Sequence, residues 1–149
     1  MGGLVARSSR TRVPDNTAEE INERLRDAAS ARVAYLAKHP DLIEGRLGEL
    51  DREWDIERAI EANAATLMLT GLALGAMGDR RWLSLSGMVA AFLLQHAVQG
   101  WCPPVPILRR LGFRTTAEIE QERRALKMLR EVGTSESTVA AALHAVRSG

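Results

Sequence analysis

The sequence predicts an all-α membrane protein, in which a two-helix transmembrane hairpin is flanked by amphipathic cytoplasmic helices. Three observations predict this fold class. Residues 62–78 and 82–108 of the 149-residue chain contain no Asp, Glu, Lys or Arg. The segments on either side are highly charged and repeat their apolar residues at helical spacing. A proline-rich segment with paired arginines follows the second uncharged stretch, as expected where a chain leaves a membrane.

Residues 1–16 lack periodicity and are predicted to form a flexible N-terminal arm. Residues 17–54 are predicted to form cytoplasmic amphipathic helices. Thr17 and Glu20 have the spacing of a capping box, in which each side chain binds the other residue's free backbone N–H. Pro40 ends this first helix, because the residue before a proline disfavours the helical conformation. Its apolar stripe consists of Ile21, Leu25, Ala29, Val33 and Leu36.

A second amphipathic segment follows within residues 41–55. Its glycines, Gly45 and Gly48, weaken a helix by about 1 kcal/mol each relative to alanine. The helix therefore needs a partner, and its stripe suits either the first helix or a lipid headgroup surface. That stripe consists of Ile43, Leu47, Leu50 and Trp54.

Residues 55–114 contain the predicted transmembrane hairpin, with helices over residues 62–78 and 82–99. A helix needs about 17–25 residues to cross a bilayer, so both helices are at the lower edge of this range. The alternative is a hairpin buried inside a soluble bundle. The flanking helices carry narrow apolar stripes, which cannot cover two helices that are apolar on all sides. Membrane insertion is therefore the favoured interpretation.

The distribution of Lys and Arg predicts the orientation of the hairpin, because cytoplasmic flanks carry more of these residues. The connection between the two helices contains Arg80 and Arg81. The flanks contain more, namely Arg46, Arg52, Arg58, Arg109, Arg110, Arg114, Arg123, Arg124 and Lys127. Both termini are therefore expected in the cytoplasm.

Small residues are expected to hold the hairpin together, because lipid supplies no hydrophobic drive for helix association. Gly71 and Gly75 form a GxxxG pattern in the first helix, and Gly87 has Ala91 at the same interval in the second. These faces suit contact within one hairpin or between two chains. A homodimer is expected, since two helices alone bury little surface.

Residues 115–149 are predicted to form C-terminal cytoplasmic helices. Thr115 and Glu118 give a second capping box, and Gly133 is expected to end that helix. A weaker helix is predicted over residues 137–147. The thin apolar stripe of the first of these helices consists of Ile119, Leu126 and Leu129.

The segment GWCPPVPILRR, residues 100–110, is predicted to cross the headgroup region in an extended conformation, because its prolines cannot continue a helix. Trp82 and Trp101 are expected at the membrane–water interface, which indole rings favour. Arg109 and Arg110 are expected to contact lipid phosphates.

Cys102 is the only cysteine, and two interpretations of it remain open. A thiolate near arginines is reactive, so Cys102 could carry sulfur or respond to oxidants in a sulfur-handling or thiol-redox membrane component. However, Cys102 follows the C-terminal end of a helix, whose partial negative charge opposes a thiolate. A purely structural role for this segment needs no chemistry from the thiol.

No arrangement of catalytic residues is recognisable, and the three histidines are scattered at positions 39, 96 and 144. We therefore expect no enzymatic activity, no metal and no cofactor. The formal net charge of +1 gives no reason to expect a nucleic-acid partner. The leading hypothesis is a dimeric membrane hairpin that acts as an anchor or interaction module, with the bilayer and an unidentified cytoplasmic protein as partners.

The GWCP motif, the apolar link and LRRLG, preceded by two short apolar helices, resemble the YgaP-like transmembrane domain, a bacterial inner-membrane family. The resemblance covers about Trp54 to Arg114, and the stretch from Arg114 to Arg123 more loosely resembles the tails of stand-alone members. It implies a dimerising two-helix hairpin in the inner membrane. In the best-known member this hairpin anchors a rhodanese, a sulfurtransferase domain. Because Cys102 is the only cysteine here, the sequence has no rhodanese active loop.

Overall fold

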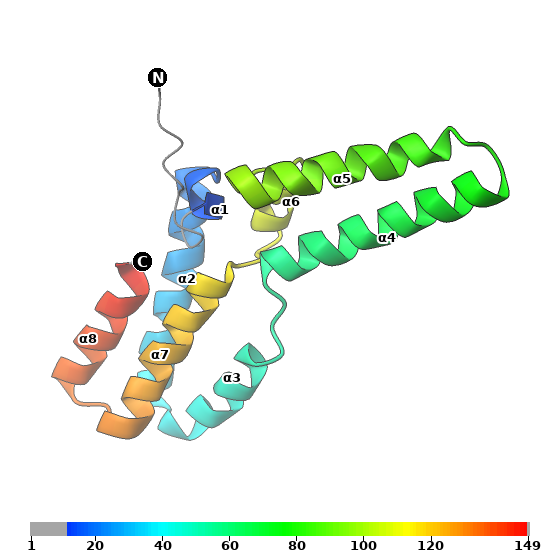
Figure 1. The fold of residues 1–149 in the computed structure, drawn as a ribbon. Coiled ribbons are helices and arrows are strands. Elements are labelled where there is room, and N and C mark those ends of the chain that lie inside the picture. Colours follow the sequence, from blue (N-terminus) through cyan, green and yellow to red (C-terminus); the bar gives the residue numbers. More distant parts are fainter. Residues whose placement is uncertain (1–11, 149) are drawn as a thin grey trace. The chain divides into compact units, whose positions relative to one another are not determined.

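A computed structural model describes residues 12–148, and all the regular elements in that range are helices. The predicted all-α class is therefore confirmed. The helices are α1 (Arg12–Asp15), α2 (Glu19–Lys38), the 3₁₀ helix η1 (Pro40–Leu42), α3 (Ile43–Leu50), α4 (Ile56–Met77), α5 (Trp82–Gln99), α6 (Val105–Arg110), α7 (Thr116–Val132) and α8 (Glu136–Arg147) (Figure 1). They belong to two compact units, each described separately below.

The first unit contains α1, α4, α5 and α6. Helices α4 and α5 run side by side as a hairpin with a short turn between them (Figure 1). Within residues 12–148, α4 is the one helix that is both long enough and apolar enough to cross a membrane by length and composition. Helix α5 has 18 residues, and the polar side chains of Gln95, His96 and Gln99 lie in its last turns. The two helices therefore pack as a hairpin, but composition indicates a membrane crossing for α4 alone, so the two-helix transmembrane hairpin stays a prediction.

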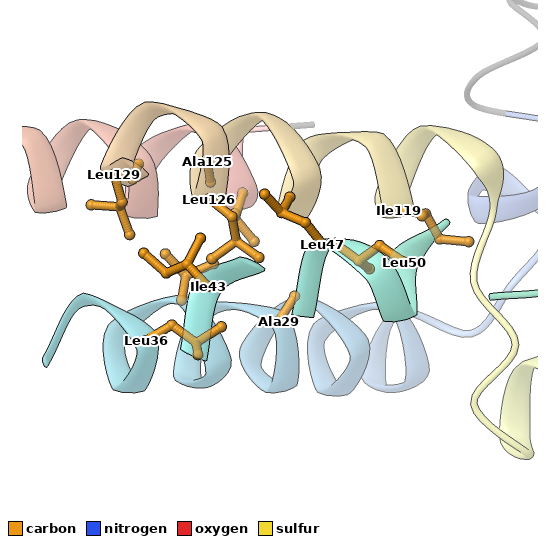
Figure 2. Close-up of a cluster of buried hydrophobic side chains, with 12 residues drawn as sticks. Ala29, Leu36, Ile43, Leu47, Leu50, Ile119, Ala125, Leu126 and Leu129 are labelled. Atoms are coloured by element: carbon orange, nitrogen blue, oxygen red, sulfur yellow. The ribbon is translucent and has the colours of Figure 1, made fainter. Parts of the chain in front are cut away.

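The second unit is a bundle built from two separate segments of the chain, residues 18–55 and residues 112–148. Helix α2 packs against α7 and α8, and α3 packs against α7. Each helix turns its apolar stripe inward, so that two segments separated by the hairpin share one hydrophobic core (Figure 2). The core consists of Ala29, Val33, Leu36, Ile43, Leu47, Leu50, Ile119, Ala125, Leu126, Leu129, Ala142 and Val146. The fourth residue of the predicted second stripe, Trp54, lies beyond the end of α3 and is exposed.

Two of the predicted helix boundaries have the expected chemistry. Thr115 accepts a hydrogen bond from the Glu118 backbone, and the Glu118 side chain accepts one from the Thr115 N–H, which confirms the capping box. Helix α7 ends at Val132, and Gly133 follows with a φ of +99°, a left-handed conformation that favours glycine. The capping box and the glycine at position 133 were therefore sufficient to predict both ends of α7 from the sequence.

Three local predictions were wrong. The capping box at Thr17 does not form, because α2 begins after Ala18 and the Thr17 hydroxyl donates instead to the carbonyl of Val13. The predicted N-terminal arm, residues 1–16, is helical over Arg12–Asp15, while residues 1–11 lie outside the described residues. Residues 105–110 form helix α6 rather than an extended segment, because proline is well tolerated in the first turn of a helix.

Candidate functional site

The first candidate site is the α4–α5 hairpin, whose two helices pack through small residues and are linked by a hydrogen bond. A Cβ atom added at Gly71 would lie 2.6 Å from the Ser86 Oγ and 2.9 Å from the Trp82 carbonyl oxygen. A Cβ atom added at Gly75 would lie 2.6 Å from a methyl carbon of Leu83. The Ser86 hydroxyl donates to the Met68 carbonyl across the hairpin at 2.9 Å. Gly71 and Gly75 therefore face α5 of the same chain, and their lack of side chains lets the helices approach closely.

Gly87 lies on a different face of α5. No atom lies within 4 Å of a Cβ atom added at this glycine, and both Gly87 and Ala91 are exposed. The three glycines predicted as helix-packing residues therefore divide into two groups. Gly71 and Gly75 serve contacts inside the hairpin, whereas Gly87 is part of a small-residue face that the hairpin does not use.

The outer surface of the hairpin is apolar and exposed. In the most apolar 18-residue window of α4, only 22% lies buried in this structure. The core helix of a soluble protein would instead be mostly buried, because its apolar side chains would need protein partners. The exposed large side chains of the hairpin are Leu67, Leu69, Leu72, Leu74, Met77, Trp82, Leu83, Met88, Phe92, Leu94 and Val98. Contiguous apolar surface of this kind marks a membrane or protein contact.

The second candidate site is the GWCPP segment, which begins where α5 ends. Gly100 adopts a φ of +75°, and its N–H donates to the His96 carbonyl at 2.7 Å. Helix α1 packs against this turn so closely that a side chain at position 100 would collide with Arg12. Arg12 also donates to the Ala97 carbonyl, and Asn16 donates to the Gln99 carbonyl at 3.0 Å. Glycine is therefore required for two reasons, the backbone conformation and the close approach of α1.

Cys102 is enclosed within this segment. Only 2% of the residue is exposed. Burial raises the pKa of the Cys102 thiol, an effect that a hydrogen bond from the Val105 backbone only partly offsets. The side chain is therefore a protonated thiol at neutral pH, whereas redox and sulfur-carrying cysteines are exposed thiolates. This geometry argues against the sulfur-handling interpretation.

Helix α6 separates the two arginines that were expected to contact lipid phosphates. Val105, Leu108 and Arg109 point inward and are buried, whereas Ile107 and Arg110 point outward. The expectation for Arg109 is therefore wrong for this structure, since its side chain is enclosed by protein. The reason is the helical conformation of the segment, in which residues three and four apart share a face.

The predicted interface tryptophans flank α5. Trp82 is its first residue, and Trp101 follows its last turn. Both indole rings are partly exposed, at 47% and 37% of the residue surface. The length of α5 therefore separates the two tryptophans along the hairpin. Residues that anchor a helix at the two membrane surfaces need such a separation.

A buried ionic network in the second unit was not foreseen from the sequence. The Glu122 side chain on α7 is 0% exposed. Its carboxylate accepts hydrogen bonds from the Arg32 Nε at 3.2 Å, from the Arg32 Nη2 at 3.0 Å and from the Arg46 Nε at 2.9 Å, and a further one from Arg114. Arg114 also binds both oxygens of Glu53, at 2.8 and 2.7 Å. The network therefore joins α2 and α3 to α7.

The electrostatics of Glu122 follow from this enclosure. Burial disfavours its charged form, but hydrogen bonds from Arg32 and Arg46 and the positive charge of Arg114 outweigh that effect. The pKa of Glu122 falls from 4.5 to about 2 as a result. A signal for this residue was present in the sequence, because position 122 lies on the stripe that Ile119, Leu126 and Leu129 define. A single glutamate on an apolar stripe indicates a buried, paired charge.

Among residues 12–148, no three His, Cys, Asp or Glu side chains are grouped so that they could hold a metal ion. The Glu122 network contains arginines, which are donors only and do not bind metals. The remaining features that bear on function are the exposed apolar surface of the hairpin, the GWCPP turn and the helical bundle.

Comparison with known proteins agrees with the resemblance inferred from the GWCP motif. Residues 55–118 match the family model described as "Inner membrane protein YgaP-like, transmembrane domain". The matched region contains the hairpin, the GWCPP segment, α6 and the first residues of α7. No curated protein and no solved structure matches the chain.

Proposed function

We propose that this chain, whose residues 55–118 match the transmembrane domain of the YgaP-like family, is a multi-pass protein of the bacterial inner membrane. In this proposal it has no catalytic activity. It anchors a cytoplasmic helical bundle, which serves as an interaction module for another protein. The observation that carries the proposal is the combination of an exposed apolar hairpin with a bundle whose core is complete.

The composition of the bundle supports the view that both α4 and α5 cross the membrane. Residues 18–55 and residues 112–149 share one core, so both segments must lie on the same side of any bilayer. The chain between them must therefore cross an even number of times. A single crossing by α4 would place the two halves of the core in different compartments. Two crossings satisfy this condition and also place the exposed apolar surface of α5 in lipid.

The orientation in this proposal follows the positive charges. The tip of the hairpin contributes Arg80 and Arg81, whereas many more Lys and Arg residues lie on the other side of both helices. The side with more positive charge remains in the cytoplasm. Both termini and the bundle are therefore assigned to the cytoplasm, and the tip to the opposite side.

The proposal includes a homodimer that forms through the Gly87–Ala91 face of α5. Gly71 and Gly75 are already used inside the hairpin, so they are not available to a second copy. The face around Gly87 is exposed and lets the backbones of two α5 helices approach closely. A Gly87→Val variant is expected to weaken dimerisation in crosslinking experiments. A variant that crosslinks as well as the wild type would remove this part of the proposal.

Two measurements test the membrane topology. Carbonate extraction should leave the protein in the membrane pellet, because insertion of two helices does not depend on surface charge. Single cysteines in a Cys102→Ser background then report the side of each region to an impermeant maleimide in spheroplasts. A cysteine at Arg80 should be labelled, whereas cysteines at Glu23 in α2 and at Glu131 in α7 should react only after lysis.

The outcomes of the labelling experiment separate the possible topologies. Labelling at positions 80 and 131 but not at position 23 would mean that α4 alone spans the membrane, and would overturn the two-crossing proposal. Labelling at positions 23 and 131 but not at position 80 would reverse the orientation. Release of the protein by carbonate would contradict insertion altogether.

A further inference from the structure

The bundle has a groove on its surface, lined by residues of α2, η1 and α3. The groove has a volume of about 530 Å³. Its apolar lining includes Tyr35 and Leu42, which are 55% and 44% exposed, and the buried Leu36. Large apolar side chains that remain exposed along one groove mark a contact site. The groove is therefore the part of the bundle surface best suited to hold a partner.

Gly45 leaves the α3 side of this groove open. The residue is exposed, and no atom lies within 4 Å of a Cβ atom added at this position. A glycine inside a helix makes the helix less stable than an alanine does, and packing within the chain gives no reason for one here. Without a side chain, the α3 backbone is accessible to the close approach of another helix. The groove is therefore suited to a helix, the element that commonly binds in apolar grooves.

Two charged side chains that line the groove have unused hydrogen-bonding capacity. Arg32 donates to Glu122 through Nε and Nη2, and its Nη1 has no acceptor among the described residues. The Arg32 side chain is 37% exposed. Glu49 is 62% exposed and accepts from the Arg46 Nη1 through one of its two carboxylate oxygens. A guanidinium carries five N–H donors and a carboxylate has two acceptor oxygens, so the groove offers both a donor and an acceptor to its occupant.

We propose that α3 of a second copy of this chain binds in the groove, so that two bundles associate about a twofold axis. Leu42, Gly45 and Glu49 follow one another at intervals of three and four residues, so they share one face of the η1–α3 segment. In the proposed interface the two α3 helices cross at Gly45. The Leu42 side chain of each copy enters the apolar part of the other groove, and each Glu49 accepts a hydrogen bond from the partner's Arg32.

The mixed charge of the groove favours a second copy over other occupants. A helix that carries only acidic residues would meet the carboxylate of Glu49, and a helix that carries only basic residues would meet the guanidinium of Arg32. A copy related by a twofold axis presents both charges, each facing its counterpart. This inference goes beyond the dimer proposed for α5, because it concerns the bundle and requires no residue of the hairpin.

Disulfide crosslinking of the full chain tests the crossing point. Gly45→Cys in a Cys102→Ser background provides a single cysteine, and the protein is reconstituted into phosphatidylcholine vesicles and oxidised with copper phenanthroline. A disulfide needs two Cα atoms within about 7 Å, so Gly45→Cys should form a covalent dimer rapidly. Gly48→Cys is the matched control, because Gly48 also has open space on α3 but does not line the groove. It should crosslink slowly, and the open space at both positions should leave the thermal unfolding midpoints of the two variants similar.

A pair of charge substitutions tests the contact between Glu49 and the partner's Arg32. In the Gly45→Cys chain, Glu49→Arg should slow crosslinking by up to about fivefold, the effect of one exposed ion pair. The matched control is Glu44→Arg. Glu44 is an exposed carboxylate of α3 that pairs with Arg130 at 3.0 Å and does not line the groove. This control should leave the crosslinking rate unchanged.

The outcomes separate this interface from the α5 dimer. Crosslinking at position 45 that is no faster than at position 48 would overturn the groove inference, and equal effects of the two charge substitutions would overturn the Glu49 contact. Crosslinking at position 45 should persist in Gly87→Val. If it disappears there, α5 alone holds the copies together and the groove inference is wrong, while the proposed membrane dimer stands. Protein that carbonate releases but that still crosslinks at position 45 would contradict the membrane proposal and support the groove interface.

Discussion

The buried carboxylate of Glu122 makes a strong prediction about the stability of the bundle. Its pKa falls from 4.5 to about 2 in the folded protein. One pKa unit corresponds to about 1.4 kcal/mol, so the ionised side chain stabilises the bundle by about 3 kcal/mol at neutral pH. Glu122→Gln removes this charge and leaves Arg32, Arg46 and Arg114 close together. Removing one partner of a buried ion pair lowers the free energy of unfolding by about 3–5 kcal/mol.

Hydrogen exchange measures this loss in the full chain in detergent micelles. If opening of the bundle limits exchange of the α7 amides, a loss of about 3 kcal/mol should accelerate their exchange by about 150-fold in Glu122→Gln. The matched control is Glu131→Gln, the same substitution at an exposed position of α7, where the carboxylate forms an ion pair with its neighbour Arg130. An exposed pair contributes less than about 1 kcal/mol, so exchange in the control should change little.

The same residue predicts a pH dependence. The pKa of Glu122 is lower in the folded state than in the unfolded state, so its stabilisation is complete above pH ~4.5 and is lost as the pH falls toward 2. About 2 kcal/mol of the difference between wild type and Glu122→Gln should disappear between pH 7 and pH 3. Equal protection of α7 in the two proteins at pH 7 would refute the reasoning, because the carboxylate would then not hold the network together.

Three further predictions concern the membrane domain. Gly71→Val should lower the midpoint of thermal unfolding in detergent, because its side chain would meet the Ser86 hydroxyl and the Trp82 backbone, whereas Gly87→Val should leave that midpoint of the monomer unchanged. Equal midpoints for the two variants would show that the hairpin does not pack through Gly71. Gly100→Ala should be destabilising, because the new side chain strains a left-handed backbone, costing about 1 kcal/mol, and also meets Arg12. Thermal unfolding measures this loss, and an unchanged midpoint would contradict it. Cys102 should react slowly with maleimide at neutral pH in the folded protein and quickly in denaturing detergent, because its thiol is buried and protonated; fast labelling of the folded protein would instead favour a reactive thiol.

Local signals predicted those parts of the fold that depend on neighbouring residues. The start of α5 at Trp82, the capping box at Thr115 and the end of α7 at Gly133 all follow from residues within one or two turns. The helical conformation of α6 did not follow, because proline opposes a helix in its interior but favours its first turn, and the sequence does not say which case applies.

The bundle could not be predicted in the same way. Each flanking helix carries a narrow stripe that suits either another helix or a lipid surface, so the sequence does not identify its partner. In the structure, Ile43 and Leu47 pack in one cluster with Leu126 and Leu129, which are about eighty residues further along the chain. Contacts at that separation are specified by complementary shape and charge rather than by local periodicity. The sequence indicates this packing only at Glu122, where a charged residue lies on an otherwise apolar stripe.

The interrupted bundle also has a consequence for biosynthesis. The ribosome completes α2 and α3 first, then the hairpin, and only afterwards α7 and α8. Until the last helix emerges, Leu36, Ile43 and Leu47 lack their partners in the core, so the first two helices are open to aggregation or chaperone binding. In the proposed topology, the core of the bundle therefore forms only after the hairpin has been inserted, and a stalled insertion would leave an incomplete N-terminal half for proteases to remove.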